Sequence, residues 1–235
     1  MKEKFSIFLS KYVPSNRFFC TPFFRRKKTV RKYLAIIYEQ VLIKSVNTCV
    51  ELTKWIDTQT TLTDFEIMTL DLAIKRYKLG RGWNKEELKM HFISHVLSVA
   101  DPNIPEICKI FFERPLQGII NNYEMTIITD CMVARPKLSG DPDKPYFFLQ
   151  EFKQSQRFGR TDPEGQMLAA MLLAQQSNAD EKYLYGCYVI EKNWHFTTLK
   201  DLDYCKSPQF DSSKKEDLLQ IVYILRKLKK LIINC

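Results

Sequence analysis

The sequence predicts a mixed α+β fold in which helices come first and strands follow, and three observations support this. All seven glycines lie at or after Gly80, so the first third of the chain has few turn residues and is expected to be helical. From about residue 110 onward, short runs of β-branched and aromatic residues replace the helical spacing. Helical spacing returns after Asp162 and again after Lys214. The predicted order is therefore helices, three strands, helix, two strands, helix.

The helices at the front of the chain are predicted from apolar spacing and from capping patterns. Apolar residues at helical spacing over 32–56 predict one interrupted helix or two. Two later segments begin with a Thr or Asn cap that is followed three residues later by Glu. Gly80 is expected to end the first of these helices and Asp101-Pro102 the second. The two capping pairs are Thr63 with Glu66 and Asn84 with Glu87.

Three strands are expected in the middle of the chain. The ranges 110–120 and 124–134 are rich in β-branched and aromatic residues, and Asn121-Asn122 between them is typical of a hairpin turn. A polar loop over 139–145 precedes the third strand, 146–153. This strand opens with Tyr-Phe-Phe-Leu, so it is expected to be buried on both faces.

The last third of the chain predicts a helix, two strands and a final helix. Asp162-Pro163-Glu164 combines an N-cap, a first-turn proline and a favourable acid, and begins an Ala/Leu/Met helix that runs to about Gln176. Residues 184–199 are expected to form two strands around 191–193. An amphipathic helix is predicted from Lys214 onward. Its inward positions are Leu218, Ile221, Leu225, Leu228 and Ile232.

The net charge of +9 belongs to one end of the chain. The whole sequence has 36 Lys and Arg against 27 Asp and Glu, but residues 1–32 hold ten of the basic side chains and a single acid. From residue 33 onward, 26 basic side chains therefore face 26 acidic ones. We call residues 1–32 the basic arm. The chain is expected to divide into this arm, a helical extension over 33–82 and a main domain over 83–235.

The basic arm has interpretations that the sequence leaves open. Its run of four basic side chains, with phenylalanines nearby, would suit contact with phosphates and stacking on bases. The same mixture would suit an anionic membrane surface. A third interpretation is an extension without packed structure, or one that results from a start codon placed too early. The four basic residues are Arg25, Arg26, Lys27 and Lys28.

Several classes of protein are not expected. No run approaches the roughly 18 consecutive apolar residues of a membrane-spanning helix, so no transmembrane segment is predicted. The apolar stretch near the N-terminus is too short for a signal peptide. The seven cysteines are scattered without a CxxC pair, which argues against a disulfide framework or a zinc knuckle and favours a reducing cytoplasm. The sequence has no glycine-rich phosphate loop, so no nucleotide cofactor is expected.

The residues that indicate chemistry are three charged side chains on two predicted strands. Asp130 lies within the second strand, and Glu151 and Lys153 end the third. Because strand side chains alternate, Glu151 and Lys153 share a face while Phe152 points into packing. If the two strands pair as a hairpin, Asp130 can lie beside Glu151. Charged groups are rarely buried without partners, so this arrangement requires an explanation.

A divalent metal ion would supply that explanation. Mg²⁺ prefers oxygen ligands and usually takes one or two carboxylates together with waters and a substrate phosphate. Asp130 and Glu151 are the expected ligands of Mg²⁺ or Mn²⁺, with the backbone carbonyl of Phe152 as a further ligand. Lys153 would orient the attacking water or stabilise the charge that develops on a phosphodiester. These residue types predict metal-assisted hydrolysis of a phosphodiester.

The same residues carry a resemblance to a known family. Asp130, followed after a loop by Glu151-Phe152-Lys153, resembles the signature of the PD-(D/E)XK nuclease superfamily, which has the restriction-endonuclease-like fold. The predicted order of elements is similar to the αβββαβ core of that superfamily. The segment 146–153, with 162–166 after it, is similar to an uncharacterised bacterial group within it. Thr129 stands where many members have proline. The resemblance implies a central mixed sheet flanked by helices, with an N-terminal helical extension and a C-terminal helix.

The resemblance also implies a function and further site residues. It implies a metal-dependent nuclease that acts on nucleic acid, with DNA expected rather than RNA, and nucleases of this fold often pair as homodimers to cut two strands. Gln166 occupies the place of a Gln that assists the site in many members. Glu87 is the candidate for an acid that some members add from the first core helix. Arg157 and Arg160 are expected to bind the nucleic-acid backbone.

Each assignment also has a structural alternative. Asp130, Glu151 and Lys153 would suit a structural ion pair with an additional carboxylate. Gln166 would suit a first-turn residue bonded to the backbone, and Glu87 is accounted for by its capping box.

The rival function comes from a different class: a catalytically inactive module of the same fold that binds nucleic acid or a protein partner. It predicts that the three charged side chains are separated or neutralise one another. The histidines are not expected to bind metal. His91 and His95 have the i, i+4 spacing of a zinc pair but lack the HExxH glutamate, and His195 is expected to face solvent.

Overall fold

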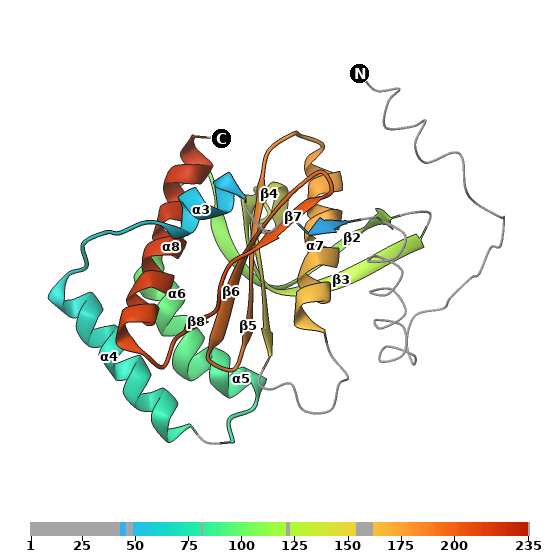
Figure 1. Ribbon diagram of the computed structural model, residues 1–235. Helices are drawn as coiled ribbons and strands as arrows, with labels where there is room; N and C mark the ends of the chain where they lie inside the picture. The colour runs from blue at the N-terminus through green and yellow to red at the C-terminus, as the bar shows by residue number, and fades with distance from the viewer. Residues whose placement is uncertain (1–42, 46–48, 81, 121–122, 154–161, 235) are drawn as a thin grey trace.

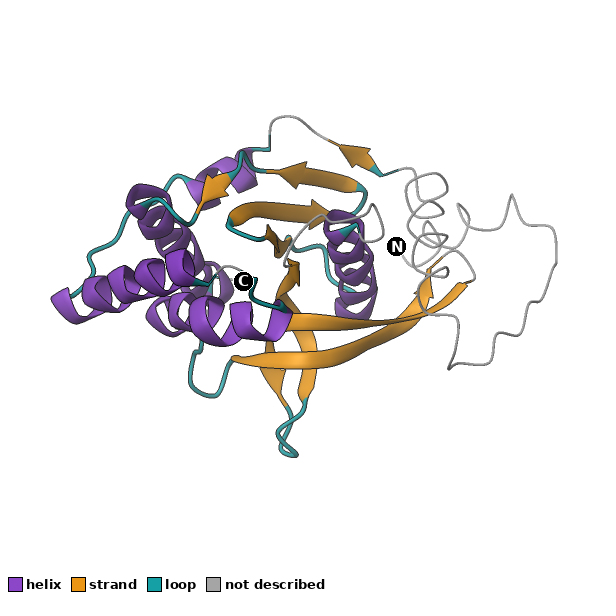
Figure 2. Cartoon of the chain, turned by 90° about the horizontal axis from the view of Figure 1, so that it is seen from below, coloured by secondary structure: helices purple, strands orange, loops and turns teal. Residues whose placement is uncertain are grey.

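Strands from distant parts of the chain join one sheet with helices on both of its faces (Figures 1 and 2). The computed structural model describes residues 43–45, 49–80, 82–120, 123–153 and 162–234 of the 235-residue chain. The strands are β1 (Lys44–Ser45), β2 (Lys109–Ile120), β3 (Tyr123–Pro136), β4 (Pro142–Lys153), β5 (Leu184–Ile190), β6 (Asn193–Lys200), β7 (Asp203–Lys206) and β8 (Phe210–Asp211). The helices are α3 (Val50–Ile56), α4 (Asp64–Leu79), α5 (Lys85–Leu88), α6 (Ser94–Ala100), α7 (Pro163–Asn178) and α8 (Lys215–Ile233), and a π-helical turn, η1 (Lys89–Ile93), joins α5 to α6.

The sheet is mostly antiparallel and has β4 near its middle. Its strand order is β1-β7-β6-β5-β4-β3-β2, and β8 pairs with β6. Among the described strands, β4 pairs with β5 in parallel and β1 pairs with β7 in parallel, while the other pairs are antiparallel. The predicted α+β class, with a central sheet flanked by helices, is confirmed.

Two hydrophobic cores hold the helices to the two faces. Helices α3, α4, α6 and α8 contribute to one core with side chains such as Phe148 and Phe152 of β4. Helix α7 fills the other core against Met132 of β3 and Leu149 of β4. Figures 1 and 2 show the long β2–β3 hairpin extending past α7, whose core it joins through Leu116. The two faces of β4 are therefore covered by different helices.

Helix α3 is anchored in the same core as elements that follow residue 83. The indole of Trp55 is fully buried, and its N–H donates to the carbonyl of Ile224 on α8 at 2.9 Å. Its ring makes edge-on contacts with Phe148, Tyr185 and Phe196. The predicted boundary between 33–82 and 83–235 stays a prediction. Residues from both ranges, such as Trp55 and Phe148, pack in one hydrophobic core.

The predicted helix ends are confirmed in detail. Both capping boxes form, with the cap side chain accepting from the backbone of the Glu and the Glu side chain accepting from the backbone of the cap. Asp162 caps α7 by accepting from the Gly165 N–H at 2.9 Å, and Pro163 occupies its first position. The helix predicted to run from Asn84 to Asp101 is continuous, except that its middle turn is the π-helical η1. All five predicted inward positions of α8 are buried.

Three expectations about local structure are wrong. Lys44–Ser45, within the range expected to be helical, pairs with β7 instead. Strand β4 begins at Pro142 because a turn closes over 137–141, where the Lys137 N–H donates to the carbonyl of Asp141 at 2.8 Å and pairing with β3 resumes at once. The Tyr-Phe pair at the start of 146–153 is only half-buried, since both side chains line a hollow at this end of β4. The turn residues Asn121-Asn122 lie outside the described residues.

No helix among the described residues is long and apolar enough to cross a membrane.

Candidate active site

Strands β3 and β4 separate at the level of Asp130 and Glu151. Their antiparallel pairing runs to Cys131 and Gln150, so the next step of the register puts Asp130 opposite Glu151. At that step the Asp130 side chain takes the place of a backbone partner, since its Oδ2 accepts a hydrogen bond from the Phe152 N–H at 2.7 Å. The carboxylate of Asp130 therefore fills the fork between the two strands.

The neighbouring strand β2 is strained at the same level. The pairs on either side place Glu113 opposite Asp130. Glu113 has a φ of 51°, in the left-handed region that residues other than glycine seldom adopt. Its carboxylate accepts from the Lys89 ammonium of η1 at 2.6 Å. Backbone strain of this kind is often found at functional sites.

The three predicted residues lie on the face of the sheet that α7 covers. Met132 on β3 and Leu149 on β4 both pack against α7. Residues two apart on a strand share a face, so Asp130 shares the face of Met132, and Glu151 and Lys153 share the face of Leu149. The hairpin register thus brings Asp130, Glu151 and Lys153 together, as the alternation in the sequence predicts.

The two acids are buried and act on each other. The side chains of Asp130 and Glu151 belong to residues that are 2% and 6% exposed. Burial, and then the negative charge of Asp130, raise the pKa of the Glu151 carboxyl to about 7, while the ammonium groups of Lys153 and Lys85 oppose the rise. Lys153 donates to Glu151 Oε1 at 2.5 Å. The acids are thus near enough to repel, although each has a cation of its own.

The cation on Asp130 is Lys85, which the sequence analysis missed. Its ammonium forms an ion pair with Asp130 Oδ1. Lys85 is the first residue of α5, directly after the Asn84 cap. The N-terminus of a helix carries a partial positive charge, so a lysine there is unfavourable unless an acid balances it. The positive charge of Lys85 at this helix end was the feature of the sequence that could have indicated a partner acid.

Gln166 has a buried oxygen that nothing in the described residues satisfies. Helix α7 runs back along β4, because Asn178 near its end bonds the backbone of Tyr146 near the start of β4. Its first turn, with Gln166, therefore lies toward the end that carries Glu151. The Gln166 Oε1 is buried and accepts no hydrogen bond from the residues that the structure describes. This oxygen is therefore not bonded to the first-turn backbone.

The other predicted site residues have different outcomes. The Glu87 carboxylate accepts from the Asn84 N–H at 2.7 Å, which is its capping role, and it is Lys85 that reaches Asp130 from this turn. The peptide of Phe152 belongs to the site through its N–H, and the ring below it is fully buried. The remaining predicted residues lie outside the described part of the chain: Arg157, Arg160, Arg25, Arg26, Lys27 and Lys28.

A polar group at the start of α7 adjoins the acids. Tyr188 of β5 lies beside Glu151 in the parallel register, and its hydroxyl donates to Glu164 Oε2 at 3.1 Å. Lys206 also bonds Glu164, at 3.0 Å. His195 stacks on Tyr188 with ring centroids 4.8 Å apart and is half-buried, so the expectation that it faces solvent is wrong. Pairing across β5 and β6 places it there.

The other two histidines, His91 and His95, each contact a side chain of the helical segment around them. The ring of His91 lies tilted against that of Trp83, with ring centroids 5.3 Å apart, and His95 bonds the guanidinium of Arg76 at 3.0 Å. Burial, and then the positive charge of Arg76, lower the pKa of His95.

The site offers two carboxylates, which are enough protein ligands for a hard cation such as Mg²⁺. The described residues contain no group of three or more His, Cys, Asp or Glu side chains that could hold a metal ion. Mg²⁺ needs only one or two carboxylates when waters and a phosphate complete its ligands. Asp130 and Glu151 supply those oxygens, with no sulfur or imidazole between them. Their mutual repulsion is the feature that a cation would relieve.

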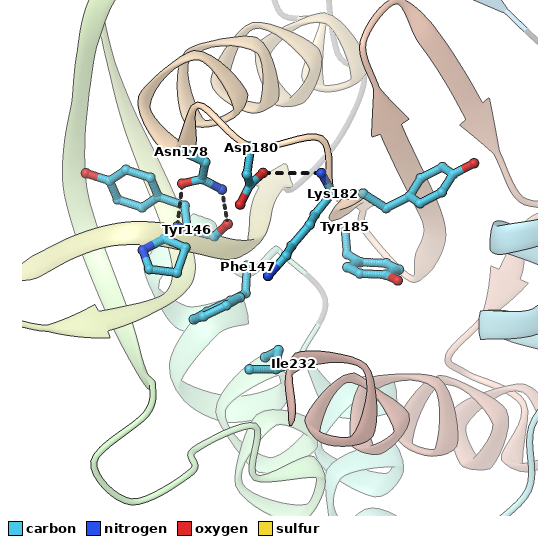
Figure 3. Close-up of a pocket in the computed structure, with 9 residues that line it drawn as sticks. Tyr146, Phe147, Asn178, Asp180, Lys182, Tyr185 and Ile232 are labelled. Atoms are coloured by element: carbon cyan, nitrogen blue, oxygen red, sulfur yellow. Dashed lines mark hydrogen bonds between the residues drawn. The ribbon is translucent and has the colours of Figure 1, made fainter. Parts of the chain in front are cut away.

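The hollow shown in Figure 3 is not part of this site. It lies at the opposite end of β4, where Asn178 forms two hydrogen bonds of 2.8 Å with the backbone of Tyr146 (Figure 3). Its lining includes Phe147, Lys182 and Ile232. It holds no paired acids of the kind found at Asp130 and Glu151.

No protein-family model matches the chain, and no curated protein matches it in sequence.

Proposed function

We propose that this protein is a metal-dependent nuclease that hydrolyses nucleic-acid phosphodiester bonds, with Asp130 and Glu151 holding Mg²⁺ or Mn²⁺. The observation that carries the proposal is the buried acid pair, in which burial, and then the charge of Asp130, raise the pKa of the Glu151 carboxyl to about 7. Burying like charges together is unfavourable for a purely structural role. A buried acid with a strongly perturbed pKa, as Glu151 has, is typical of sites that act on a ligand or substrate.

Each residue of the site has a role in this reaction. A metal ion held by the two acids would supply an activated water and would neutralise charge on the phosphodiester. Lys153, which donates to Glu151, orients the water or stabilises the developing charge. Gln166 has an oxygen that accepts no hydrogen bond from the described residues, and this oxygen can accept one from that water or from substrate. The Phe152 N–H fixes the orientation of Asp130.

The proposal includes the restriction-endonuclease-like fold and the partners that go with it. It is supported by the element order α5–α6, β2, β3, β4, α7, β5, which is αβββαβ with the acids on the second and third strands. Nucleic acid, with DNA rather than RNA, and pairing as a homodimer in the cytoplasm belong to the same proposal. The basic arm and the arginines of 154–161 would contact the phosphates.

A specific observation also favours a second function, the inactive module. Lys85 pairs with Asp130 and Lys153 pairs with Glu151, so the four charges neutralise one another. A module that binds nucleic acid or a protein without catalysing a reaction needs no metal ion in addition to these two ion pairs. The two functions differ in one respect: the nuclease requires that a divalent ion binds the acids.

Cleavage assays on the full chain test the proposal. Single- and double-stranded DNA and RNA are incubated with Mg²⁺, Mn²⁺ or EDTA, and cleavage is expected only with a metal ion. Asp130→Asn and Lys153→Met are each expected to lower the rate roughly a hundredfold or more. Asp211→Asn is the matched control, because Asp211 is also a largely buried acid with a lysine partner, Lys192 at 2.9 Å, but lies on β8.

Cleavage that survives both site substitutions would overturn the proposal, and so would cleavage in EDTA. Nucleic-acid binding without cleavage in any metal would favour the inactive module.

A further inference from the structure

Two cations and two anions occupy the site in the described structure, and the two cations are held differently. Lys153 lies on β4 beside its partner, Glu151, and its side chain is 17% exposed. Lys85 reaches Asp130 from the first turn of α5, and its side chain is 32% exposed. Lys85 therefore has an open route to solvent along its flexible stem.

The two oxygens of Asp130 are also held differently. Oδ2 accepts from the Phe152 N–H, a backbone group that the β4–β5 pairing keeps in place. Oδ1 is bound by the Lys85 ammonium. A second cation that approaches Asp130 can take the place of the ammonium without moving the backbone.

The charge balance requires such an exchange. With both acids ionised, the four groups sum to zero. A divalent ion added to a neutral, largely buried cluster would face two ammonium groups at short range, which is unfavourable at low dielectric. Release of Lys85 to solvent removes one of those charges and frees Oδ1 of Asp130.

The position of Lys85 on its helix favours release as well. Its charge lies at the positive end of α5, so Asp130 is what holds it there. The turn itself does not depend on this ion pair. The Asn84–Glu87 capping box holds it, with both of its hydrogen bonds formed.

We infer that Lys85 is the resident counter-ion of Asp130, which a divalent metal ion displaces when it binds. Lys85 is thus a positioning residue: its ion pair holds the side chain of the buried acid in place in the metal-free protein. This inference rests on the proposed function, because it assumes that Asp130 is a metal ligand. It adds that metal affinity is set by competition with the protein's own lysine.

Calorimetric titration of the full chain with Mg²⁺ and with Mn²⁺ at pH 8 tests the inference. Lys85→Met is expected to bind either ion about tenfold more tightly than the native protein, since a pairing worth about 1.4 kcal/mol corresponds to a factor of ten. Lys85→Arg, which keeps the charge, should bind as the native protein does. The double variant Lys85→Met/Asp130→Asn should lose the gain.

Lys89→Met is the matched control. Lys89 lies one turn further along, is largely buried and pairs with Glu86 and Glu113 rather than with Asp130. Its removal should leave the metal affinity unchanged. Thermal unfolding gives a second measurement: Lys85→Met should unfold at a lower temperature than the native protein without metal, and the difference should close as metal is added.

The outcomes separate the inference from the function. Equal metal affinity in the native protein and in Lys85→Met would overturn the inference and leave the nuclease proposal standing. A gain that persists in the double variant would also overturn it, because the ion would then bind elsewhere. Absence of metal binding in every variant would overturn both.

Discussion

The pKa of Glu151 predicts that its ionisation destabilises the folded protein. The pKa rises from 4.5 to about 7 in the folded chain, because of burial first and the charge of Asp130 second. An acid whose pKa is raised by folding is protonated more readily in the folded state than in the unfolded state. Between pH 4.5 and 7 the unfolded chain therefore binds fewer protons, and stability falls as the pH rises.

The size of the effect follows from the same numbers. One pKa unit corresponds to about 1.4 kcal/mol, so the shift of Glu151 amounts to about 3 kcal/mol, with the full loss reached above pH 7. Glu151→Gln, which stays neutral, should have nearly the stability of the native protein at pH 4.5. At pH 8 it should be more stable by up to about 3 kcal/mol.

Urea unfolding of both proteins from pH 4.5 to 8.5, in EDTA, measures this difference. Glu124→Gln, which makes the same substitution at an exposed acid of β3, is the control. A constant difference between the native protein and Glu151→Gln across the range would refute the reasoning. It would mean that Asp130 and burial do not oppose the charge of Glu151.

The remaining predictions concern the fold. Trp55→Phe should lower the free energy of unfolding by about 2–3 kcal/mol, since it removes the indole donor to the Ile224 carbonyl and opens a cavity. Urea unfolding would measure this loss, with Trp83→Phe, at a half-buried site, as the comparison. A loss for Trp55→Phe smaller than that for Trp83→Phe would contradict the prediction. Asp162→Ala should cost about 1 kcal/mol by removing the acceptor for the Gly165 N–H, whereas Asp162→Asn should cost much less; equal losses in thermal unfolding would show that the cap is not the cause.

Local signals in the sequence predict most of the fold because they depend on neighbouring residues. Both capping boxes and the Asp162-Pro163 start of α7 form as expected, since each is satisfied within one helical turn. The short strands β1, β7 and β8 were missed for the opposite reason. Lys44–Ser45 has no strand pattern of its own and becomes a strand only because β7 offers it a partner.

Strand alternation predicts the contacts within the β3–β4 hairpin but not the contact between the hairpin and a helix. Alternation on β4 and the hairpin register bring Asp130 to Glu151 and Lys153, as the sequence indicates. Lys85 was missed because its contact joins residues 45 positions apart, between a helix and the sheet. Only its unfavourable place at a helix N-terminus pointed to a partner.

The charge balance decides what would distinguish a nuclease from an inactive module of the same fold. In the described site Lys85, Lys153, Asp130 and Glu151 sum to zero when both acids are ionised, so a divalent ion that binds alone leaves the cluster with a net positive charge. A phosphodiester that arrives with the ion brings the negative charge that the cluster then lacks. Metal and nucleic acid should therefore bind more tightly together than apart, and this coupling is reciprocal by thermodynamic necessity. An inactive module is not expected to show this coupling, because it does not require a divalent ion to bind the acids.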